Sequence, residues 1–167
     1  MHRVKQVVGE AIYTDAALAL AKQRAVTDPD NEGFFLLEDD RTAAEVAADE
    51  LASAKEAKAA QVKEEFLPLS TLPVADADGL LWSGGWDSAT KLDAAKRLAE
   101  AAGSTTVTLY TDDNAAHTLT LPEALIVVLT VAGYYQVVLG KKQGFYLAIA
   151  DASTVTEVAA IVIDWST

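Results

Sequence analysis

The segment with the clearest chemical potential is short and rich in glycine: Ser83-Gly84-Gly85-Trp86-Asp87-Ser88. It follows a short apolar run and opens a segment with the composition of a helix. A glycine-rich turn at a helix N-terminus presents free N–H groups and the positive end of the helix dipole, so it favours a bound phosphate. In that interpretation the nucleotide contacts are Ser83, Gly84, Gly85, Asp87 and Ser88.

This segment resembles the PP-loop of ATP pyrophosphatases, which implies a nucleotide-binding enzyme built on a doubly wound parallel sheet. That fold needs perhaps twice the chain that is left here, and Leu80-Leu81-Trp82 is short for its first strand. The simpler interpretation is a tight glycine turn, with Asp87 or Ser88 capping the helix and the two tryptophans packing. We therefore expect no enzyme and no cofactor.

A second cluster matches part of a calcium-binding loop. Asp28, Asp30, Glu32 and Gly33 stand at loop positions 1, 3, 5 and 6, and Asp39 stands at position 12, where glutamate is usual. Leu36 occupies a position that needs a polar or water-mediated ligand, so an ordinary acidic turn and no metal site are expected. His2 and His117 are isolated in the sequence, which leaves general acid–base chemistry without support.

Composition narrows the classes of partner. Lys and Arg number 13 against 25 Asp and Glu, a net charge of −12, and no basic stripe is present, so nucleic acid is not an expected partner. The absence of cysteine excludes disulfides and thiolate metal sites. Residues 124–140 carry no charge, and their length of about 17 residues is the lower limit for a spanning helix. Polar Thr130 and Gln136 within them favour a buried or interface helix, without membrane insertion.

The elements that position these residues fall into four parts. Residues 1–41 are predicted to form an N-terminal arm or small subdomain. Residues 42–66 are predicted to form an alanine-rich helix, which opens with the capping box Thr42-Ala-Ala-Glu45. A proline-containing linker follows at 67–79, and the main domain covers 80–167. The large apolar residues of the helix are few, so it packs narrowly on another chain or on the main domain. The interface candidates are Val46, Leu51, Val62, Phe66, Tyr134 and Tyr135.

The main domain reads as α+β. Strands are predicted at 79–82, 106–110, 117–120 and 161–165, with helices at 88–102, at 121–150 after a capping box at Thr120–Glu123, and after a third box at Thr154–Glu157. The apolar stripe expected on 121–150 is Leu121, Leu125, Val128, Ala132, Tyr135, Leu139, Tyr146 and Ile149. Glycines 133, 140 and 144 leave a β-meander open as the alternative.

Residues 80–165 resemble a domain of unknown function that recurs at the C-terminal ends of phage tail-fibre and tail-fibre-assembly proteins. The resemblance rests on Trp82 with Asp87-Ser88 before an alanine-rich helix, Val107-Thr-Leu, Asp113-Asn114, Leu119-Thr-Leu-Pro-Glu123-Ala, residues 135–142, Ile149-Ala-Asp-Ala-Ser-Thr and Trp165. These are turn, cap and core residues, so the resemblance implies a fold and no catalytic residues.

The resemblance implies a structural component of a bacteriophage tail, at the tail tip or associated with a fibre, that acts through protein–protein contacts. The expected partners are other tail or fibre subunits and further copies of the chain, in the virion and, during assembly, in the host cytoplasm. A tail-fibre assembly chaperone is the alternative function.

Overall fold

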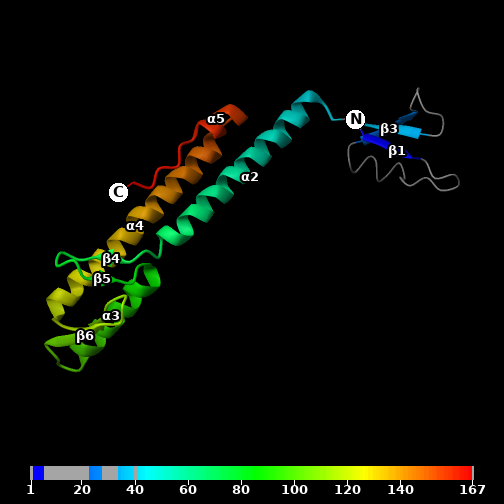
Figure 1. The fold of residues 1–167 in the computed structure, drawn as a ribbon. Helices are drawn as coiled ribbons and strands as arrows, with labels where there is room; N and C mark the ends of the chain where they lie inside the picture. The colour runs from blue at the N-terminus through cyan, green and yellow to red at the C-terminus, as the bar shows by residue number, and fades with distance from the viewer. Residues whose placement is uncertain (1, 6–22, 28–33, 40, 167) are drawn as a thin grey trace. The chain divides into compact units, whose positions relative to one another are not determined.

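A computed structural model describes residues 2–5, 23–27, 34–39 and 41–166, and side chains from residue 41 on. The chain divides into two compact units, residues 1–52 and 53–167. It is a mixed helical and sheet protein with small antiparallel sheets and one long apolar helix, α4, so the α+β prediction is confirmed (Figure 1).

The first unit holds a three-stranded antiparallel sheet in the order β1-β3-β2. Strand β3 (Phe34–Asp39) lies between β1 (His2–Lys5) and β2 (Gln23–Thr27). The apolar run Phe34-Phe35-Leu36-Leu37 lies in this central strand.

Helix α2 (Ala43–Leu69) begins where the sequence predicts. The Thr42 backbone N–H donates to Glu45 Oε2 at 2.9 Å, and the Glu45 N–H donates to Thr42 Oγ1 at 3.2 Å, which is the capping box. The helix passes the expected end near Glu65 and includes Pro68. Pro68 lies in the final turn of the helix, which ends one residue later at Leu69.

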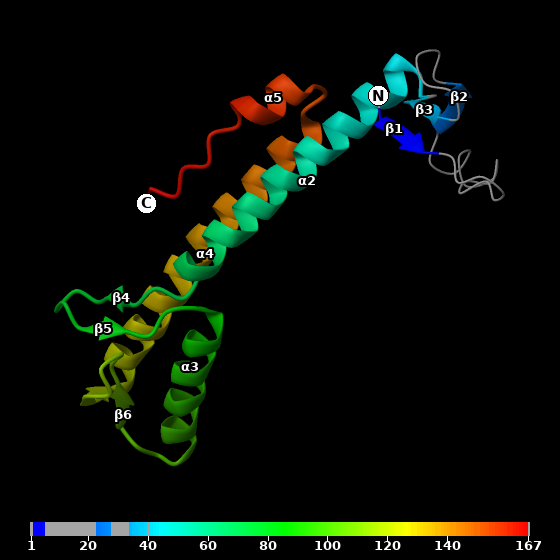
Figure 2. The same ribbon diagram turned by 45° about the vertical axis from the view of Figure 1, so that its right-hand side comes forward.

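The second unit is built around the first half of α4 (Leu121–Asp151). Helix α3 (Trp86–Ala101) and the hairpin of β6 (Thr106–Tyr110) and β7 (Ala116–Thr120) pack on it. The hairpin of β4 (Val74–Ala75) and β5 (Leu81–Trp82) lies beside them (Figure 2). The core consists of Trp82, Ala89, Leu109, Ala124, Val127 and Val131.

Trp82 is fully buried at the centre of this core, and its polar atom is satisfied. Its indole Nε1–H donates to Asp76 Oδ2 at 2.8 Å, while Asp76 Oδ1 accepts from the backbone N–H groups of Asp78 and Leu80. Burial raises the pKa of the Asp76 carboxyl, but these three hydrogen bonds outweigh it and hold the pKa below its usual value. Asp76 therefore fixes the turn that carries Trp82 into the core. The proline-containing segment 67–79, which was predicted as a linker, therefore contains β4 and this turn.

The second half of α4 runs antiparallel to the part of α2 that belongs to the same unit. Lys55 Nζ donates to the Ala150 carbonyl at 2.7 Å, and Phe66 meets Tyr135 further along (Figures 1 and 2). Helix α5 (Val155–Ala160) begins at the predicted box, with Glu157 N–H donating to Thr154 Oγ1. Residues 161–166 then return along the helix pair.

Two predictions about the C-terminal region are wrong in part. The segment 121–150 is helical throughout, as predicted. Its buried residues are Ala124, Val127, Val128, Val131, Val138 and Ile149, so the predicted stripe is correct at Val128 and Ile149 but omits the other four. Leu125, assigned to that stripe, is exposed. Residues 161–165 form no strand, because no sheet edge is within reach for pairing. They keep the alternating burial of an extended chain, with Ile161, Ile163 and Trp165 turned inward.

Candidate functional site: surfaces for protein contact

The glycine-rich segment is packed against the chain that precedes it. A Cβ on Gly84 would lie 1.9 Å from the Leu72 carbonyl oxygen, and one on Gly85 would lie 3.1 Å from the Ser70 carbonyl oxygen. Both glycines are buried, and Gly85 has a φ of 93°, which favours glycine. The glycines therefore allow two backbone segments to touch, and the space that a phosphate would need beside Gly84 is filled.

The other residues of the nucleotide interpretation also have structural contacts. Ser83 Oγ donates to Asp112 Oδ1 at 2.7 Å, and Asp87 pairs with Lys91 one turn along α3 at 2.7 Å. Gly85 is the N-cap residue of α3 and no side chain caps it, so the expectation that Asp87 or Ser88 caps this helix is wrong. Trp82 is buried as expected, whereas Trp86 is 53% exposed.

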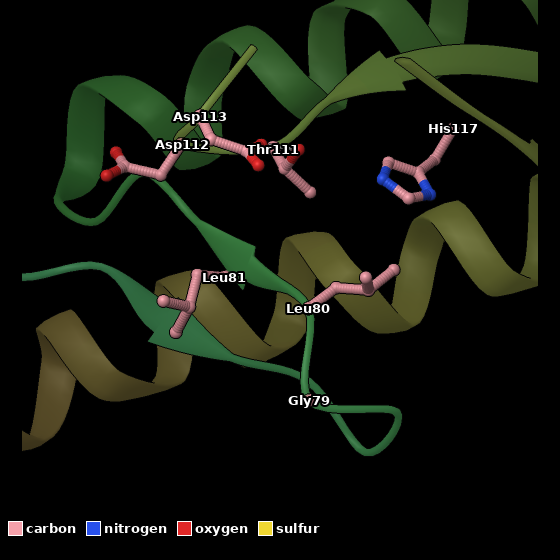
Figure 3. Close-up of a pocket in the computed structure, with 7 residues that line it drawn as sticks. All are labelled: Gly79, Leu80, Leu81, Thr111, Asp112, Asp113 and His117. Atoms are coloured by element: carbon pink, nitrogen blue, oxygen red, sulfur yellow. Dashed lines mark hydrogen bonds between the residues drawn. The ribbon is translucent and has the colours of Figure 1, made fainter. Parts of the chain in front are cut away.

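A cavity of about 320 Å³ opens between the β4–β5 turn and the β6–β7 turn (Figure 3). Asp112 lies at one end of the view and His117 at the other, with the leucines below them. Asp113 Oδ1 accepts from Thr111 Oγ1 at 2.6 Å and from the Ala115 N–H at 3.1 Å, and these bonds lower the pKa of its carboxyl. The His117 ring packs edge-on against Trp82. Both aspartates are thus engaged in holding the turns.

The most connected side-chain group in the second unit is a cluster of aromatic rings. We define the aromatic cluster as Phe66, Trp86, Tyr135, Phe145 and Trp165. Phe66 of α2 lies 6.4 Å from Tyr135 and 6.3 Å from Trp165, measured between ring centroids. Phe145 contacts Trp165 at 5.0 Å. The cluster therefore joins α2, α3, α4 and the C-terminal segment.

Polar groups complete this cluster. The Trp165 indole Nε1–H donates to Glu65 Oε2 at 2.9 Å, and Lys142 Nζ lies 4.2 Å from the centre of the Phe66 ring. A cation over a ring face is attracted by the ring electrons. Lys141 Nζ also donates to the Ser166 carbonyl. The C-terminal segment is thus fixed to both long helices by rings, by a hydrogen bond to a carboxylate and by a lysine.

The interface candidates from the sequence divide into two groups. Val62 and Phe66 are buried within the second unit, so they hold α2 to its own chain. Val46, Leu51, Tyr134 and Tyr135 are half-buried. Tyr135 belongs to the aromatic cluster and contacts Trp86 at 6.0 Å.

One exposed surface was not predicted from the sequence: the side of α4 that is turned away from α2 and α3. We call it the outer face of α4 and define it by Ile126, Leu129, Gly133, Gly140, Gly144 and Leu147. The three large side chains are between 59% and 65% exposed, and a Cβ on any of the three glycines would meet nothing within 4 Å. In the sequence, Ile126, Gly133, Gly140 and Leu147 recur every seven residues.

Helix α4 is also, among the described residues, the helix long and apolar enough to cross a membrane by length and composition. Only 28% of its most apolar window is buried. Its residues Ala124, Val127 and Val131 are nevertheless part of the core around Trp82. Insertion would expose that core, so the geometry favours a helix that covers its own domain with one face.

The calcium interpretation lies mostly outside the described residues. Asp28, Asp30 and Glu32 are not among them, and Asp39 is described only as the last residue of β3, where it pairs with Gln23. In the part of the chain that the structure describes, no group of three His, Asp or Glu side chains could hold a metal ion.

Compared with protein-family models, curated proteins and solved structures, the chain matches none of them.

Proposed function

We propose that the protein is a structural subunit of a bacteriophage tail, at the tail tip or associated with a fibre, and that it works through protein–protein contacts. The assignment to a tail comes from the resemblance of residues 80–165 to the tail-fibre-associated domain. The mode of action comes from the surface of the second unit.

The observation that carries the mode of action is the number of large apolar side chains outside the core. Besides Ile126, Leu129 and Leu147 they include Leu67, Leu72, Leu81, Trp86, Leu98, Tyr110 and Val137, each at least 44% exposed. Single exposed apolar residues are ordinary, but several on one helix face are typical of an interaction surface. In a tail, neighbouring subunits would cover these exposed apolar side chains.

A tail-fibre assembly chaperone is the second candidate, because it too would use exposed apolar side chains to hold a fibre chain. The two functions differ in where the protein ends up. A structural subunit stays in the mature particle in a fixed number of copies, whereas a chaperone is present in infected cells and leaves before the particle is complete.

Quantitative mass spectrometry of purified virions of the encoding phage separates the two. We expect several fixed copies per particle, measured against the major tail protein, and the same copy number after a high-salt wash. The control is a cytoplasmic host protein of similar abundance, which should be removed by purification. Absence from virions despite expression in infected cells would contradict the structural role and favour the chaperone.

A further inference from the structure

The outer face of α4 has the spacing of a helix that packs on another helix. Ile126, Gly133, Gly140 and Leu147 are seven residues apart, and Leu129 follows Ile126 by three. A repeat of seven keeps side chains on one seam of a helix pair. Yet within the described part of the chain no element covers this seam, because its large side chains are exposed and its glycines have no neighbours.

The face is complementary to itself when a second copy is turned end for end. With the twofold axis between Gln136 and Val137, Ile126 of one copy reaches the level of Leu147 of the other, and Gly133 that of Gly140. Leu129 then stands over the partner's Gly140 and Gly144, where the missing Cβ atoms leave room for it. In this register Leu129 meets glycine on the partner, while Ile126 meets Leu147 and Gly133 meets Gly140.

Charge does not oppose a second copy at the outer face of α4. The chain carries a net charge of −12, so two copies repel each other over most of their surfaces. Between Ile126 and Leu147 the outer face carries no charged residue, because Lys141 and Lys142 lie on other sides of the helix. This is a surface through which two acidic copies can approach without desolvating a charge.

We propose that the outer face of α4 binds a second copy of this chain, forming an antiparallel helix pair centred between Gln136 and Val137. The inference deepens the proposed function and rests on it for its biological setting, since it names the partner that covers one exposed surface of the subunit. The helix pair closes on itself and leaves the aromatic cluster and the α3 surface free for other subunits.

Single-cysteine cross-linking of the full chain tests the orientation, because the chain has no cysteine of its own. In an antiparallel pair Gln136→Cys lies beside its copy at the twofold axis, so mild oxidation should give a covalent dimer. Ile126→Cys should not cross-link, because the two copies of residue 126 are about 31 Å apart along the helices at 1.5 Å per residue. Leu98→Cys, an exposed leucine on α3, is the control and should stay monomeric.

Size-exclusion chromatography with light scattering then tests the face itself. Leu129→Glu should weaken the dimer at least tenfold, while the matched change Leu98→Glu on α3 should leave it unchanged. Gly140→Leu should also weaken it at least tenfold, although leucine is the better helix former, so the unfolding temperature of the dilute protein should not fall. The control for added bulk is Ala94→Leu on the exposed side of α3.

Three outcomes would overturn the proposal. One is a monomer at all concentrations, including a monomer that floats with phosphatidylcholine vesicles. Another is cross-linking of Ile126→Cys as efficient as that of Gln136→Cys, which indicates a parallel pair. The third is a dimer that survives both Leu129→Glu and Gly140→Leu. None of these bears on the virion measurement, so a failed dimer and a failed tail assignment remain distinguishable.

Discussion

At the scale of single residues, glycine serves two opposite purposes in this protein. Gly84 is buried, and its missing Cβ lets the backbone reach the Leu72 carbonyl. Gly133, Gly140 and Gly144 stand on an open helix face with nothing near them. Glycine inside a helix costs about 1 kcal/mol relative to alanine. Three such residues on one face therefore destabilise α4, and no contact within the described part of the chain offsets this cost.

This contrast predicts opposite effects of the same substitution. Gly84→Ala should lower the free energy of unfolding by about 3 kcal/mol, because the new methyl group overlaps a backbone carbonyl that cannot move aside easily. Gly133→Ala should raise it by about 1 kcal/mol, because the methyl group meets no atom and the helix gains a better former. Urea unfolding of dilute protein, followed by circular dichroism at 222 nm, measures both changes.

The two glycine variants serve as each other's control. Equal destabilisation by both changes would mean that Gly133 is in contact with its own chain, contrary to the exposed position described above. A neutral Gly84→Ala would mean that the segment 70–72 can withdraw, which would reopen the glycine turn as a site for an anion.

At the scale of elements, the aromatic cluster holds α2 against α4. The two helices touch through side chains: Phe66 with Tyr135, Lys55 with the end of α4, and Trp165 between them. The alanine-rich surface of α2 buries only Val62 and Phe66 fully, so the rings supply much of the apolar contact. The C-terminal segment is thus a structural part of the helix pair.

Trp165→Ala should lower the free energy of unfolding by about 2 kcal/mol, since a half-buried indole loses two ring contacts and its hydrogen bond to Glu65. Val162→Ala is the matched control in the same segment. Its side chain is 78% exposed, so its effect should stay within about 0.5 kcal/mol. Thermal unfolding followed by calorimetry distinguishes the two. Equal small effects would show that the C-terminal segment contributes nothing to the pairing of α2 with α4.

The helix starts that carry a capping box were predictable from the sequence because a capping box is local, whereas α3, which has no side-chain cap, begins two residues before its predicted start. At Thr42, Thr120 and Thr154 a hydroxyl and a carboxylate three residues later satisfy each other's backbone N–H groups, and all three boxes form. The orientation of α4 was not predictable, because residues 124–129 are apolar all round the helix and periodicity cannot select a face. Residues 161–165 alternate like a strand, but pairing depends on a sheet edge that local sequence does not reveal.

The candidate sites also divide into features that local sequence predicts and features that depend on distant contacts. The glycine turn was found in the sequence, and its role in close packing depends on the segment 70–72 that lies against it. The bond between Glu65 and Trp165 could not be predicted, because the two residues are 100 positions apart and neither belongs to a motif. The outer face of α4 has a seven-residue spacing, but the predicted stripe repeats at the same interval, so spacing alone could not separate the buried face from the exposed one.

At the scale of the whole molecule, acid should destabilise the fold through its capping carboxylates. Backbone and hydroxyl donors at Thr120 lower the pKa of Glu123, and those at Ser153 lower the pKa of Glu157. A carboxyl whose pKa is lowered on folding stabilises the folded state at any pH above its pKa in the unfolded chain, which is about 4.3 for glutamate. This contribution is lost as the pH falls from that value through the pKa of the folded state. The free energy of unfolding should therefore fall below about pH 4.3.

Urea unfolding midpoints measured from pH 7 to pH 3 test this effect, with Glu123→Gln as the comparison. The variant lacks one of the titrating groups, so its stability should fall less steeply in acid than that of the parent. Protonation also relieves the general repulsion of a chain with net charge −12, and this acts equally on both proteins. Parallel pH curves for parent and variant would contradict a role for the Glu123 carboxylate.

The aromatic cluster has a consequence for the order of events in folding. Its Glu65–Trp165 contact closes a loop of 100 residues, whereas β6 and β7 are joined by a short turn and α3 adjoins β6 in sequence. Closing a loop costs more entropy as it lengthens, and distant contacts form more slowly than local ones. We therefore expect the hairpin and the helices around Trp82 to assemble first and α2 to join last, when the ring of Trp165 reaches Phe66.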